Sequence, residues 1–194
     1  GFLRRMQGDE HAHYRQALVR VIDPGAVDSL RPALDGVIAQ GLAAYAAGGQ
    51  NSAPAYRRTL SEIADAMLIP LFFGSPYGSR YLEDLQSAFH RLGPDGFEWF
   101  IGNEQKRQFE AIRDRLLDHV ADLRAREGHW MEPSILGRMV RAGDLDETSL
   151  GHLIYMVEMG RFDLASLFRW ITKYVAEDRS LQERLHAGGG TQLG

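Results

Sequence analysis

The sequence predicts an all-α fold, and three observations support this. Apolar residues recur at helical spacing through most of the 194 residues, and no segment alternates apolar and polar residues as a strand would. Breaker clusters such as Gly74-Ser75-Pro76 separate the helical segments. The balance of 44% hydrophobic and 25% charged residues is that of a soluble globular protein. We therefore expect one helical domain over residues 1–187, followed by a disordered tail at 188–194.

The helix boundaries follow from capping residues and breakers. Asp23 is a suitable N-cap and Pro24 suits a first helical position, while Gly48-Gly49 ends the helix that starts there. Asp144 to Glu147 and Ser180 to Glu183 both have the spacing of a capping box. In chain order, the predicted helices span about 9–22, 24–47, 56–73, 79–92, 97–126, a short stretch after 133 ending near 143, 146–177, and a last short helix from 180.

Composition excludes several classes of function. A net charge of −4 argues against nucleic acid as the main partner. The chain has no cysteine, which excludes disulfides, zinc–thiolate clusters and cysteine nucleophiles within it. The longest apolar run, Met67 to Phe73, is interrupted by Pro70 and is too short to span a bilayer. The first residues lack the apolar core of a signal peptide, so we expect a cytoplasmic protein with no membrane partner.

The predicted helix at 146–177 is the most informative element, because at about 1.5 Å per residue it crosses a whole domain. Gly160 lies in the middle of its apolar stripe, which indicates close packing or a distortion beside a ligand. The stripe comprises Leu153, Val157, Leu164, Leu167, Ile171 and Val175. Asp163 is the one carboxylate in a second row of residues formed by Met156, Gly160, Asp163, Leu167 and Tyr174. If buried, it needs a partner or a shifted pKa, and a hydrogen bond to a neighbouring element is the simpler explanation.

Three segments in this order resemble the cytochrome P-450 family, bacterial type. The first is Gly8 to Leu18, followed by Asp23-Pro24 and Leu30-Arg31-Pro32, and it resembles the family's C helix. Leu68 to Gly74 resembles the end of the E helix. Leu150 to Leu185 resembles the I helix continuing into the J helix. The resemblance implies an incomplete P-450-like helical core with a long central I-type helix, lacking the Glu-x-x-Arg of the K helix and the cysteine loop that ligates haem.

The family resemblance also implies roles for individual residues. His11 and Arg15 would hold the haem propionates, and Gly160 would leave room for dioxygen. In the aligned run Met159-Gly160-Arg161-Phe162-Asp163, the family's acid becomes Phe162 and its alcohol becomes Asp163, which would act in the alcohol's place. The expected substrate pocket comprises Met156, Met159, Arg161 and Leu164. Arg161 is also explained by an i,i+3 ion pair with Glu158, and no metal site is expected from the chain's own side chains.

Two functions from different classes follow. The first is a portion of a haem-thiolate monooxygenase that oxidises a small organic substrate, for example in secondary metabolism, with electrons from a redox partner protein. The alternative is a haem-less relative that stabilises or activates a partner enzyme such as a glycosyltransferase. The absence of cysteine favours the second, and the His11–Arg15 pair and Gly160 favour the first. A helical bundle that uses its cavity as a hydrophobic binding site is a third possibility. Finally, Trp99, Phe100, Trp130 and Trp170 are expected in the core.

Overall fold

The computed structural model describes residues 5–22, 24–49, 52–74, 79–92, 102–126 and 134–189, and within these ranges all regular structure is helical. The predicted all-α fold is therefore confirmed. The helices are α1 (Gly8–Val21), α2 (Pro24–Ala47), α3 (Ala53–Phe73), α4 (Arg80–Leu92), α5 (Asn103–Arg126), α6 (Ile135–Ala142), α7 (Glu147–Glu177) and α8 (Arg179–Gly189). Helix α8 runs through Gly188 and Gly189 of the expected tail, and the rest of that tail lies outside the described residues.

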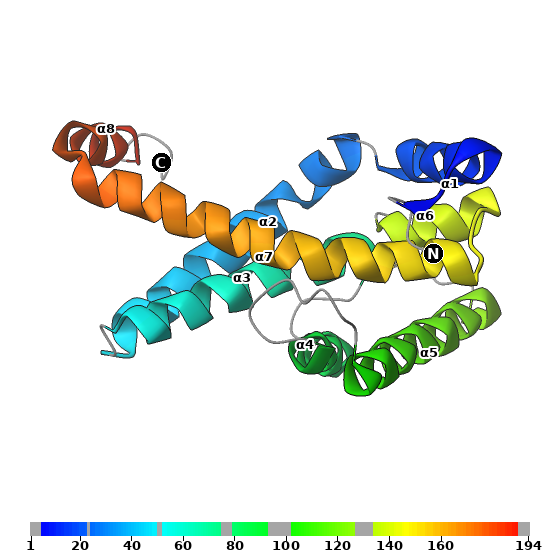
Figure 1. Ribbon diagram of the computed structural model, residues 1–194. Coiled ribbons are helices and arrows are strands. Elements are labelled where there is room, and N and C mark those ends of the chain that lie inside the picture. The colour runs from blue at the N-terminus through cyan, green and yellow to red at the C-terminus, as the bar shows by residue number, and fades with distance from the viewer. Residues whose placement is uncertain are drawn as a thin grey trace.

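Helix α7 runs through the middle of the molecule and organises the others (Figure 1). Helix α3 packs along it and α2 packs on α3, while α4 and α5 form a pair on another side. Helices α1 and α6 contact each other near the N-terminal end of α7, and α8 follows its C-terminal end. The long central helix that the sequence predicts is thus present, and α3, α5 and α8 contact it directly.

Predicted breakers end the helices for local reasons. Gly74 adopts the left-handed conformation, with φ 71°, and its N–H donates to the carbonyl of Pro70. Gly143 ends α6 in the same way, with φ 73°. A left-handed residue at this position is easiest for glycine, which lacks the Cβ that would clash. At the other end of α3, the Ser52 hydroxyl accepts a hydrogen bond from the N–H of Ala55.

The buried core joins α1, α3, α4, α5 and α6 to the N-terminal half of α7. At its centre the rings of Phe73 and Phe89 stack with centroids 6.0 Å apart. The fully buried side chains around them come from five helices, α3 to α7, and include Ile69, Leu85, Ile112, Leu116, Leu136, Met139, Leu150, Leu153, Ile154 and Val157. Ala165 is the last buried residue along α7, and four of the large apolar residues that follow are exposed.

The expectation that Trp170 lies in the core is wrong, because 54% of this residue is exposed. Together with Leu167, Ile171 and Tyr174 it forms an apolar row on the outer side of α7, hereafter the exposed stripe. The spacing i, i+3, i+4, i+7 indicates that these residues share a face but cannot say which face turns inward. Trp99, Phe100 and Trp130 lie outside the described residues.

Both predicted capping boxes are displaced. Asp146 caps α7, since its carboxylate accepts from the N–H of Ser149 and the Ser149 hydroxyl accepts from the N–H of Asp146. The carboxylate of Asp144 is instead engaged by Arg20 of α1, at 2.8 and 2.9 Å from Nη2. Helix α8 is capped by Asp178, which accepts from the N–H of Leu181. The spacing in sequence is compatible with several caps, and at α7 the long-range pair with Arg20 engages the residue that the spacing favoured.

We predict that Asp146→Ala lowers the free energy of unfolding by about 1–2 kcal/mol, because it removes an N-cap. It also removes the acceptor of the Tyr14 hydroxyl, which lies 2.9 Å from Asp146 Oδ2. Urea unfolding at pH 7 measures the change. Glu147→Ala is the matched control, because Glu147 is exposed and belongs to the predicted box but not to the observed one. A larger loss for Glu147→Ala than for Asp146→Ala would contradict this assignment.

Candidate functional site

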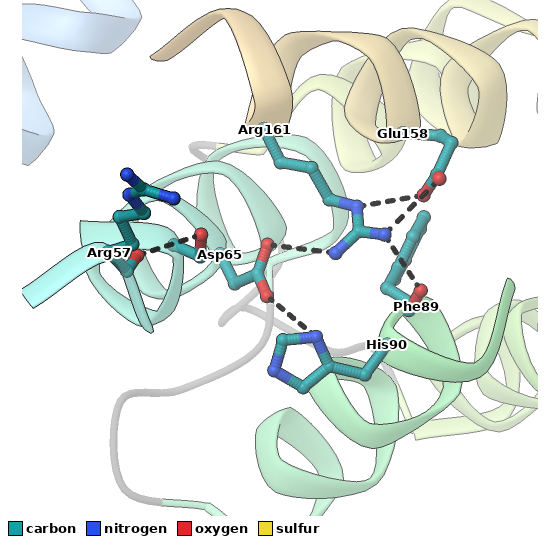
Figure 2. Close-up of polar contacts among 7 residues, drawn as sticks. Arg57, Asp65, Phe89, His90, Glu158 and Arg161 are labelled. Carbon is teal, nitrogen blue, oxygen red and sulfur yellow. Dashed lines mark hydrogen bonds and ion pairs between the residues drawn. The ribbon is translucent and has the colours of Figure 1, made fainter. Parts of the chain in front are cut away.

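The guanidinium of Arg161 lies buried between α3, α4 and α7, and only 5% of the residue is exposed (Figure 2). Its Nε donates to Glu158 Oε2 at 2.8 Å, and its Nη2 donates to Glu158 Oε1 at 3.2 Å. The same Nη2 donates to the backbone carbonyl of Phe89 at 3.1 Å. The i,i+3 pair expected from sequence is confirmed, but it is part of the interior rather than of the surface.

Asp65 and His90 complete a group that we call the Arg161 cluster: Asp65, His90, Glu158 and Arg161. Asp65 is 1% exposed, with Oδ1 3.8 Å from Arg161 Nη1 and Oδ2 3.9 Å from His90 Nδ1. Neither oxygen of Asp65 has a hydrogen-bond partner among the described residues. Burial raises the pKa of Asp65 to about 6, although Arg161 and His90 act in the opposite direction.

Asp65 and His90 are not among the functional residues that the sequence predicts. Asp65 does leave a signal, because it lies four residues before Ile69 and seven before Phe72, on the face that α3 buries. A carboxylate in such a row is expected to meet a cation from another element. His90 leaves none, because it is a half-exposed side chain at the end of α4.

Gly160 is half-buried, and α7 continues as an α-helix through it. A Cβ placed on Gly160 would lie 3.5 Å from Leu68 Cδ1, an ordinary van der Waals contact. The described neighbours therefore do not require glycine for packing. The helix is not interrupted at Gly160, contrary to the expected distortion. Any space for a ligand beside Gly160 therefore comes only from its missing side chain.

Asp163 is exposed, which corrects the expectation of a buried carboxylate in an apolar row. The row that contains Asp163 is not buried, because two of its members, Leu167 and Tyr174, are themselves 53% and 61% exposed. Of the expected substrate-pocket residues, Met156, Met159 and Leu164 are half-buried. Arg161 differs from these three, because its guanidinium is turned into the Arg161 cluster (Figure 2).

His11 and Arg15 lie on α1, where His11 is half-buried and Arg15 is exposed. Among the described residues, neither side chain makes a hydrogen bond or an ion pair. Helix α1 meets α7 where the Tyr14 ring contacts the ring of His152, with centroids 5.3 Å apart. His152 precedes Gly160 by eight residues, or about 12 Å of helix. That His11 and Arg15 share a space with Gly160 remains a prediction.

Two further classes of site find no support in the described part of the chain. Within it, no three His, Asp or Glu side chains gather in a way that could hold a metal ion. No helix there has the length and apolar character needed to cross a membrane.

Two curated relatives are similar to nearly the whole chain. Both are named abscisic acid 8'-hydroxylase 2, from Oryza sativa subsp. indica and subsp. japonica, and each is 24% identical over 93% of this chain. The chain spans 38% of the length of each relative. No family model and no solved structure matches. The similarity indicates a distant relationship to a cytochrome P-450 hydroxylase, in agreement with the family resemblance seen in the sequence.

We predict that Arg161→Met lowers the free energy of unfolding by about 3–5 kcal/mol, because it leaves the Glu158 and Asp65 carboxylates without their buried cation. Arg169→Met is the matched control, since Arg169 is an exposed arginine on the same helix. Its expected effect is within about 0.5 kcal/mol. Chemical denaturation at pH 7 measures both changes. Equal losses in the free energy of unfolding would show that the buried position of Arg161 adds no stability beyond that of an exposed arginine.

Proposed function

We propose that the chain is a central helical portion of a P-450-like haem-thiolate monooxygenase that acts on a small organic substrate. The observation that carries this is the 24% identity to a hydroxylase, which extends over 93% of the chain rather than over one motif. The geometry of α7 supports it, because the glycine and acid of the aligned run, Gly160 and Asp163, lie where the buried half of the helix gives way to an open face.

Haem is a flat apolar ring with two carboxylates and an axial ligand, and the described residues fit two of these three requirements. Half-buried Gly160, with the half-buried Met156, Met159 and Leu164 beside it on α7, offers an apolar surface. His11 and Arg15 offer an imidazole and a guanidinium one turn apart that no described residue occupies, and a guanidinium suits a carboxylate. The thiolate is not supplied here, because the chain has no cysteine. When bound with such a ligand, haem would supply the activation of dioxygen.

The chain's own residues would then do the following. His11 and Arg15 would orient the two propionates, and Gly160 would leave space above the ring. Asp163, which stands where the family has an alcohol, would present a carboxylate oxygen that solvent can reach. Met156, Met159 and Leu164 would line the apolar approach. The burial of Arg161 supports a structural role instead of substrate contact.

The same proposal includes a small organic substrate, a redox partner protein that supplies electrons, and a cytoplasmic location. A haem-less helper that stabilises a partner enzyme is the second candidate. Two observations favour it: the absence of cysteine from the sequence and the replacement of the family's acid and alcohol by Phe162 and Asp163. The two candidates differ in whether the His11–Arg15 pair and the open face of α7 bind haem at all.

We predict that the chain binds ferric haem saturably and that Arg15→Ala weakens binding by about tenfold or more. A charge-assisted hydrogen bond contributes roughly 1.5–3 kcal/mol, which corresponds to that change in affinity. The Soret band measures the titration. The carbon monoxide difference spectrum of the reduced complex should lack a thiolate-type band, since a thiolate needs cysteine.

Arg58→Ala is the matched control, because Arg58 is an exposed arginine on α3, a helix that contributes no residue to the His11–Arg15 pair. Gly160→Leu is the second variant, since its side chain would extend toward Leu68 of α3 and fill the space that glycine leaves for the ring. Absence of saturable binding favours the haem-less candidate. Equal affinity in the wild type, Arg15→Ala and Gly160→Leu would place any bound haem elsewhere on the chain.

A further inference from the structure

Asp65 is the surplus charge of the Arg161 cluster. The guanidinium of Arg161 donates two hydrogen bonds to Glu158 and one to the carbonyl of Phe89. These contacts already pair one cation with one carboxylate. Asp65 lies farther from the guanidinium, with Oδ1 3.8 Å from Arg161 Nη1, and neither of its oxygens has a hydrogen bond among the described residues. With a neutral His90, the cluster therefore holds one negative charge more than it can balance.

The groups that face Asp65 come from each of the helices around it. Arg161 and Glu158 face it from α7, His90 faces it from α4, and Glu62 lies one turn away on α3 itself. Arg161 and His90 favour the ionised form, whereas Glu158 and Glu62 oppose it. The side chain of His90 is 52% exposed while that of Asp65 is 2% exposed. His90 is thus the member of the cluster through which solvent can exchange a proton.

We propose that Asp65 and His90 together bind one dissociable proton, and that its loss loosens the packing of α4 against α3 and α7. With the proton on His90, the imidazolium faces Asp65 Oδ2 across 3.9 Å and balances its charge. With the proton on Asp65, the buried group is neutral. Once the proton leaves, the carboxylate gains by reaching water, and the least obstructed route is displacement of the end of α4 that carries His90. This proposal does not depend on haem binding.

The pH dependence follows from the direction of the shift. Burial raises the pKa of Asp65 to about 6 in the folded chain, above its ordinary value of 3.8. A carboxyl with a raised pKa contributes stability that is fully present below the unfolded value and is lost as the pH rises through the folded value. The loss therefore falls between about pH 4 and about pH 6, and the contribution stays absent at higher pH.

The test compares wild type with Asp65→Asn in urea unfolding from pH 4 to pH 8. Asparagine copies the shape of the protonated carboxyl, so the two unfolding constants should agree near pH 4. Above about pH 6 the wild type should unfold more readily by roughly tenfold or more. Amide hydrogen exchange compared at one pH, near 7, should show slower exchange in α4 of Asp65→Asn, with α5 unchanged. A ratio of unfolding constants that stays constant from pH 4 to pH 8 overturns the proposal.

Two further variants keep the test decisive. His90→Gln leaves Asp65 as the sole site for the shared proton, so the proton is bound less tightly and the midpoint of the pH-dependent step should move to lower pH. An unchanged midpoint would show that His90 does not share the proton, which also overturns the proposal. Glu83→Gln is the control, because Glu83 is an exposed carboxyl on α4 and should leave the step where it is.

Discussion

The burial of one guanidinium, that of Arg161, is the interaction on which the arrangement of the central helices depends. Arginine stays charged in proteins, so its burial requires acceptors in fixed positions. Glu158 supplies two acceptors one turn earlier on α7, and the carbonyl of Phe89 at the end of α4 supplies a third. The third acceptor is a backbone atom, so it is present only if α4 ends beside α7. The same burial brings Oδ1 of Asp65, on α3, to 3.8 Å from Nη1 of Arg161. One side chain thereby fixes three helices relative to one another.

This constraint also divides α7 into two halves with different surroundings. Before Arg161, the buried face of the helix is apolar, with Leu150, Leu153, Ile154 and Val157 inaccessible to solvent. After Ala165, the exposed stripe carries its large apolar residues on the outside. Gly160 and Asp163 lie between the buried and the exposed half of α7, so a site there would be bordered by the packed core on one side and by solvent on the other. A position beside a buried ion pair favours a rigid helix, in line with the unbroken α-helix through Gly160.

Much of the fold could be predicted from sequence, because helix ends are decided locally. Gly74 and Gly143 end helices where the breakers indicate, and Pro24 begins one. What the sequence could not decide was which side of a helix turns inward. The exposed stripe has the same spacing as a buried one, so spacing alone places Trp170 in the core and Asp163 in an apolar row, whereas both are exposed. Likewise the Arg161–Glu158 pair follows from spacing, but its burial depends on α3 and α4, which are about 70 or more residues away in the chain.

The most direct measurement of this account is a double-mutant cycle between Arg161 of α7 and Asp65 of α3, at pH 8, where Asp65 is ionised. The cycle combines Arg161→Met with Asp65→Asn and follows the free energy of unfolding. If the buried guanidinium joins the helices, Arg161→Met costs less when Asp65 is already asparagine, with a coupling energy of about 0.5–3 kcal/mol. Additive effects of the two substitutions would contradict the claim, because they would show that α3 and α7 are placed by their apolar contacts alone.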